Sequence, residues 1–152
     1  MITLLDAMQA ALIADPTLAA YLGEAVEVRQ WDPDTLPDFD RYGVVLSPND
    51  ESEQPAGVLG IEKTFPVQIV CLVRIGGTLA EALAGETGPD GIGVLKFAED
   101  VRAVLRGNSL GGAVIADSLA VSKSSRPEPV SAQLPHALAM TIEYSGRRRV
   151  EL

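Results

Sequence analysis

The stretch IEKTFPVQIVCLVRI, residues 61–75, decides the expected fold. Alternate positions are apolar, and two positions between them are apolar as well. The first set is Phe65, Val67, Ile69, Cys71, Val73 and Ile75, and the second is Val70 and Leu72. Side chains of a strand alternate between its two faces, so this pattern predicts a central strand that is buried on both faces. Gly76 and Gly77 follow and end it.

Segments of helical periodicity lie on both sides of this strand. Residues 2–14 and 92–106 place apolar side chains at helical spacing, which predicts two helices with one apolar face each. Asp15 followed by Pro16 is typical of a helix start, and Gly23 is typical of a helix stop. A short helix over 16–22 is therefore expected.

Four further segments have strand character: 24–31, 42–46, 113–123 and 133–145. The segments between them are polar or rich in turn-forming residues and predict exposed connections: 32–40, 47–59, 76–91 with a short helix opening at Thr78, and 124–132. Strands come in consecutive groups rather than alternating with helices. This order favours one α+β domain over 1–152, with a mainly antiparallel mixed sheet of about five strands and two main helices packed on one face.

Composition excludes several classes of protein. The 152 residues carry 12 Lys plus Arg against 21 Asp plus Glu, a net charge of −9, which argues against binding nucleic acid through its phosphates. The single cysteine rules out an internal disulfide, and the single histidine rules out a site that needs two from one chain. No continuous apolar run is long enough for a membrane span, and the N-terminus lacks the pattern of a signal peptide, so a cytoplasmic origin is expected.

One motif points to catalysis. Residues 107–111, GNSLG, match the G-x-S-x-G nucleophile elbow around Ser109, and Asp117 and His136 follow in the order of a hydrolase triad. The elbow needs a strand before the serine and a helix after it. Here a predicted helix precedes Ser109 and a predicted strand follows, so the segment fits a helix end and a turn. We expect no catalytic residue and no enzyme activity.

Other candidate sites have plain structural interpretations. His136 lies on the apolar side of its strand, where a partly buried histidine is usually hydrogen-bonded. Cys71 is expected to be a buried small hydrophobe. The acidic loop around Asp32 and Asp34 lacks the glycine and glutamate of an EF-hand. Lys96 lies in a helix and completes no P-loop. No cofactor and no metal are expected.

The only basic run is Arg147, Arg148 and Arg149, which follows the last predicted strand. Such a run is usually a solvated tail. Alternatively it contacts acidic surface on a neighbour, since the same chain supplies acidic loops at 32–40 and 50–53. The candidate contacts with a neighbouring molecule, either another subunit or a different protein, are therefore Arg147, Arg148, Arg149, Asp38 and Asp40.

The order of elements resembles a known family. LLDAMQAAL at 4–12 leads into DPTLAAYLG at 15–23, and the pattern continues with YGVVL at 42–46, FPVQIV at 65–70 and VRAVL at 101–105, followed by two strands. This layout resembles the tail terminator, or tail completion, proteins of long-tailed bacteriophages and related gene-transfer particles. The similarity is a pattern of elements over nearly the whole chain, and the 48–60 and 76–91 loops are longer than it needs.

The resemblance implies a structural protein of the virion tail, at its head-proximal end, assembled in the host cytoplasm. It implies a homo-hexameric ring that caps the tail tube protein, stops its polymerisation and offers a surface to the head-side connector or adaptor protein. DNA passes through the lumen of such a ring without specific binding, and a net-acidic protein suits that passage. Two alternatives stay open: another head–tail joining (neck) protein, and a small serine hydrolase using Ser109 and His136.

Overall fold

A computed structural model describes residues 2–49, 52–55, 60–74, 92–106, 108–110, 120–124, 127–130 and 137–151 of the chain. The helices are α1 (Ile2–Ala14), α2 (Pro16–Ala19) and α4 (Val94–Leu105). The strands are β1 (Val26–Val28), β2 (Tyr42–Pro48), β3 (Ser52–Pro55), β4 (Gly60–Arg74), β5 (Ala120–Ser124), β6 (Glu128–Pro129) and β7 (Ala137–Glu151). The fold is α+β, as the sequence predicted.

The described strands form one mixed sheet with the order β1-β2-β4-β7-β5. The short strands β3 and β6 pair with β4 and β7 beside this path. Only β1 and β2 are parallel, with Val26 opposite Val44. The remaining pairs are antiparallel, and β4 pairs with β7 along its whole length, from Gly60 opposite Glu151 to Arg74 opposite Ala137. The predicted mainly antiparallel sheet is confirmed.

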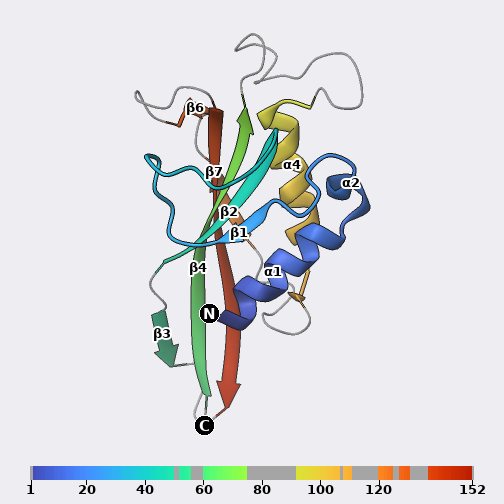
Figure 1. The fold of residues 1–152 in the computed structure, drawn as a ribbon. Helices are drawn as coiled ribbons and strands as arrows, with labels where there is room; N and C mark the ends of the chain where they lie inside the picture. Colours follow the sequence, from blue (N-terminus) through green and yellow to red (C-terminus); the bar gives the residue numbers. More distant parts are fainter. Residues whose placement is uncertain are drawn as a thin grey trace.

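The core lies on both faces of β4, as the pattern of residues 61–75 predicted. Odd-numbered side chains such as Ile69 and Cys71 pack with those of α1 and α4, which cover one face of the sheet (Figure 1). Even-numbered Val70 and Leu72 pack on the other face with Phe39, which belongs to the segment 29–41 between β1 and β2. Burying these apolar side chains from water is the main force that stabilises the sheet.

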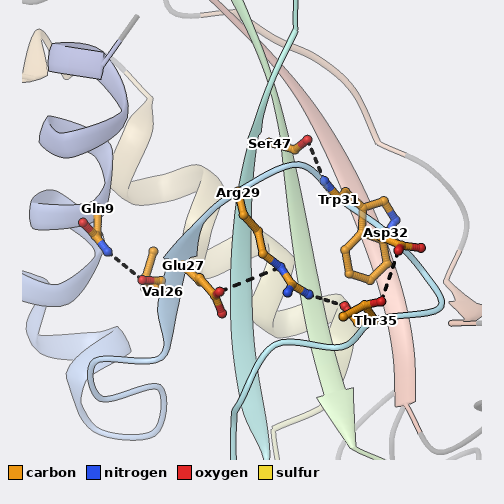
Figure 2. A network of polar contacts seen from close by, with 8 residues as sticks. All are labelled: Gln9, Val26, Glu27, Arg29, Trp31, Asp32, Thr35 and Ser47. Atoms are coloured by element: carbon orange, nitrogen blue, oxygen red, sulfur yellow. Dashed lines mark hydrogen bonds and ion pairs between the residues drawn. The ribbon is translucent and has the colours of Figure 1, made fainter.

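Particular residues determine where α2 begins and how the chain turns from it into β1. The Asp15 carboxylate accepts a hydrogen bond from the Leu18 amide at 3.0 Å, and Pro16 opens α2, as predicted. Gly23 has a φ of +63°, a conformation that glycine adopts at little cost, and it turns the chain toward β1. The Gln9 side chain donates to the Val26 carbonyl at 2.7 Å, so α1 covers part of the open edge of β1 (Figure 2).

Several predicted limits are wrong. The strand expected over 24–31 is confined to Val26–Val28, and the short helix expected over 16–22 ends at Ala19. The connection expected over 47–59 contains β3, which pairs with the outer part of β4 and whose sequence, SEQP, has no apolar alternation to predict a strand. The connection over 124–132 contains β6. Of the strand expected over 113–123, residues 120–123 lie in β5, which continues to Ser124.

The last strand differs most from its prediction. It was expected to end at 145, where the apolar alternation ends, but β7 continues to Glu151. Its partner β4 reaches Gly60, so backbone pairing continues after the core has ended. Residues 75–91, 111–119 and 131–136 lie outside the described part of the chain, and with them the predicted helix at Thr78, Asp117 and His136.

Candidate assembly surface

The outer ends of β4 and β7, together with β3, form a polar arm that extends past the helices (Figure 1). We define the arm as residues 52–55, 60–65 and 146–151. It contains four basic and three acidic residues, whereas the rest of the chain contains eight basic and eighteen acidic ones. The arm therefore lacks the negative charge excess that the rest of the chain has as a whole.

The three arginines lie within β7 of the arm, and the interpretation of a tail that follows the last strand is wrong. Arg147 is opposite Thr64, Arg148 opposite Lys63, and Arg149 opposite Glu62. Successive strand residues point to opposite faces. Arg148 therefore shares the face of Lys63 and the helices, while positions 147 and 149 share the other face.

An ion pair between Arg147 and Glu62 joins the two long strands of the arm. Arg147 Nη1 lies 3.5 Å from Glu62 Oε1, and the side chains are 46% and 20% exposed. An exposed pair of this kind contributes about 0–1 kcal/mol to stability. Its charges consequently stay accessible to a partner.

Asp38 and Asp40 are exposed, with the buried Phe39 between them. Arg74 donates to the Phe39 carbonyl at 3.2 Å, and its guanidinium lies 4.4 Å from the centre of the Phe39 ring. Gly43 leaves room for this ring, because a Cβ there would lie 2.8 Å from a Phe39 ring carbon. The anchored Phe39 thus holds both carboxylates on the outside.

A polar network attaches the preceding part of the same segment to the sheet (Figure 2). Arg29 donates to the Thr35 carbonyl, and the Thr35 hydroxyl donates to Asp32 at 3.1 Å. The Trp31 amide donates to the Ser47 hydroxyl at 3.0 Å. The Asp32 carboxylate is therefore used within its own turn, as the sequence predicted for a turn residue.

The acidic residues and the arginines lie at opposite ends of β4. The Arg74 amide donates to the Arg41 carbonyl at 2.9 Å, which places Asp40 near the Arg74 end. Arg147 is opposite Thr64, ten residues away along β4, or about 33 Å. One copy therefore does not bring its own candidate residues together.

A surface pocket of about 440 Å³ adjoins Asp40. Asp40 and Arg41 line it from one side, with Tyr21 and Tyr42 among the other lining residues. Sequence reasoning missed this pocket. The sequence offered only a weak signal for it. Tyr21 follows the short helix α2 and Tyr42 begins β2, and aromatic residues are few in this chain.

A buried carboxylate holds the wall of the pocket in place. Asp100 on α4 is 8% exposed and accepts hydrogen bonds from the Tyr21 hydroxyl at 2.7 Å and from Lys96 at 2.5 Å. Burial and the Asp100 hydrogen bond raise the pKa of Tyr21. The Tyr21 ring also meets Tyr42 and Phe97 edge-on, with centroids 5.0 and 5.6 Å away.

Two tyrosine-to-phenylalanine variants should have different effects on stability. Tyr21→Phe removes the bond to Asp100 and should lower the free energy of unfolding by about 1–2 kcal/mol, because hydrogen bonds to charged groups are the stronger ones. The buried Tyr144 hydroxyl has no hydrogen-bond partner among the described residues, so Tyr144→Phe should be neutral or stabilising. Urea unfolding of both variants beside the wild type checks this. Equal losses in the two variants would contradict the assignment.

The serine motif lies at the end of α4. The Asn108 side chain donates to the Val104 carbonyl at 3.1 Å and accepts from the Leu110 amide at 2.9 Å. Ser109 thus follows a helix, whereas a nucleophile elbow places it after a strand. Asp117 and His136 lie outside the described residues, so the structure does not relate them to Ser109.

Neither the scan against protein-family models nor the search of curated proteins found a match to this chain. Within the described residues, no three His, Cys, Asp or Glu side chains are placed to hold a metal ion. None of the described helices is long and apolar enough to cross a membrane.

Proposed function

We propose that this protein is a phage-type tail terminator, a structural protein that assembles as a homo-hexameric ring on the head-proximal end of a tail tube. The ring stops polymerisation of the tube protein and offers a surface to the head-side connector or adaptor. The proposal starts from the resemblance in element order. It assigns no catalytic residue, cofactor or metal to the protein. We place the protein in the virion tail after assembly in the host cytoplasm.

The single observation that carries the proposal is the separation of charge along the molecule. The arm with Arg147 lies at one end of β4, and Asp38 and Asp40 lie near the other end. Two different and complementary surfaces on one chain support head-to-tail contacts, which close into a ring when the rotation between copies allows it. Opposite charges also increase the rate and the specificity of such contacts.

The net charge supports the second part of the proposal, passage of DNA. Outside the arm, acidic residues outnumber basic ones by eighteen to eight. A lumen lined by such a surface repels phosphates and does not hold the DNA.

Electron microscopy of particles that lack this protein tests the function. We expect tails of abnormal length, longer than wild type, because nothing stops the tube from growing. Wild-type protein supplied in trans should restore normal length, and a Ser109→Ala variant should restore it equally well. Tails of normal length that stay unattached to heads would instead assign a neck protein, and failure of Ser109→Ala to restore function would favour the hydrolase.

A further inference from the structure

The pocket beside Asp40 carries two opposite charges in adjacent positions. Asp40 is exposed and Arg41 is half-buried, with the Arg41 guanidinium 5.6 Å from the Tyr42 ring centre. The half-buried Tyr21 supplies aromatic surface next to these charges, and the buried Tyr42 ring lies beneath it. A carboxylate next to aromatic rings is a favourable environment for a guanidinium group, through charge-assisted hydrogen bonds and cation–π contact.

The arm presents the matching pair of charges. Arg147 and Glu62 lie side by side on the face of the arm away from the helices, on neighbouring strands. Both side chains are anchored on strands paired along their whole length, so a partner meets a fixed pattern. The arm thus presents a basic group, Arg147, beside an acidic group, Glu62. These charges are complementary to Asp40 and Arg41 at the pocket.

We propose that the arm of one copy docks on the pocket of the next copy, with Arg147 against Asp40 and Glu62 against Arg41. This inference rests on one part of the proposed function, the self-assembly of the chain. It does not depend on the proposed role in ending the tail tube. The pocket volume of about 440 Å³ lies in the range of sites that enclose small ligands, which leaves space for the arginine side chain. The occupant is thus a second copy of this chain.

The distance between the two surfaces makes the contact intermolecular. About 33 Å of β4 separates the levels of Asp40 and Arg147, and β4 is a continuous strand of the central sheet. The same chain cannot close this distance without breaking the sheet. Each copy then uses its arm on one neighbour and its pocket on the other, a head-to-tail arrangement that forms a ring when the rotation between copies closes.

A charge exchange tests the contact. Asp40→Arg alone and Arg147→Asp alone should each weaken self-association at least tenfold, because each leaves two like charges facing one another. The two substitutions together should restore association to within about threefold of wild type. Asp34→Arg is the matched control: it makes the same charge change at an exposed position of the same segment, and it should change association less than threefold. Sedimentation equilibrium measures association, and circular dichroism verifies the fold.

A cross-link provides the second measurement. A variant with Asp38→Cys and Thr64→Cys keeps Asp40 and Arg147 and places a thiol near each of them, since Thr64 is opposite Arg147. In this variant a short bis-maleimide should join different copies into a covalent ladder, in purified protein or in purified tails. Asp34→Cys with Thr64→Cys should give none, and the buried native Cys71 stays unreactive. Absence of a ladder in both preparations, or failure of the exchanged pair to restore association, overturns the docking contact.

The two proposals fail separately. Overlong tails in the absence of the protein, together with a negative cross-link, would keep the terminator and remove this contact. Restored association by the exchanged pair, together with normal tails in the absence of the protein, would keep the contact and remove the terminator.

Discussion

Cys71→Asp will prevent the chain from folding. Cys71 is fully buried on β4, opposite Met140 of β7 and Val44 of β2. Burial raises the pKa of its thiol to about 12, although the nearby Arg102 acts in the opposite direction, so even a thiolate is disfavoured there. An unpaired carboxylate at this site costs several kcal/mol, and a domain of this size has about 5–15 kcal/mol of stability in total. We expect loss of the cooperative unfolding transition in circular dichroism.

A conservative variant and a chemical probe serve as controls. Cys71→Ala should fold, with a loss of about 1–2 kcal/mol for the removed sulfur atom and the small cavity. In the native wild type, a thiol reagent should modify Cys71 only as fast as the protein opens. Modification at the rate of a free thiol, or a folded Cys71→Asp variant, would place this residue outside the core.

Phe97→Ala should lower the free energy of unfolding by about 3–5 kcal/mol. Phe97 is fully buried on α4, and its ring meets those of Tyr21 and Tyr42 edge-on, each 5.6 Å away. Loss of the ring leaves a cavity between α4 and the sheet and removes two aromatic contacts. Because Tyr21 and Tyr42 line the proposed pocket, self-association should weaken in the same variant.

Leu95→Ala is the matched control on the same helix. Leu95 is 45% exposed, so its truncation should change stability by less than about 0.5 kcal/mol. Urea unfolding compares the two variants. A loss for Phe97→Ala no larger than that for Leu95→Ala would show that α4 does not cover the sheet as described.

Sequence patterns predicted the core because burial produces periodicity. Residues 69–73 are apolar on both sides, and the structure covers both sides of β4 there. The apolar faces of residues 2–14 and 92–106 likewise correspond to α1 and α4, which pack on one face. Asp15 and Pro16 predicted the start of α2 because a helix N-terminus needs particular residue types, whereas the end predicted at Gly23 was too late.

The arm could not be predicted in the same way. Its strands carry polar residues on both faces, so no periodicity distinguishes them from a loop. The continuation of β7 to Glu151 depends on backbone pairing with β4, and backbone hydrogen bonds leave no mark on side-chain composition. The sequence identified the arginines as candidate contacts by their charge. It could not predict that they lie on a strand and point to two different faces of it.

The place of β7 in the sheet has a consequence for synthesis of the chain. Strand β7 is the last described strand in chain order, yet it lies between β4 and β5. During translation β4 can pair with β2, but its other edge stays open until residues 137–151 have been made. The apolar residues 69–73 thus pass through a stage with one unpaired edge, in which neighbouring nascent chains can pair with them. Ribosome pausing before residue 137 would prolong this stage and increase aggregation, whereas both edges of β4 are paired in the finished protein.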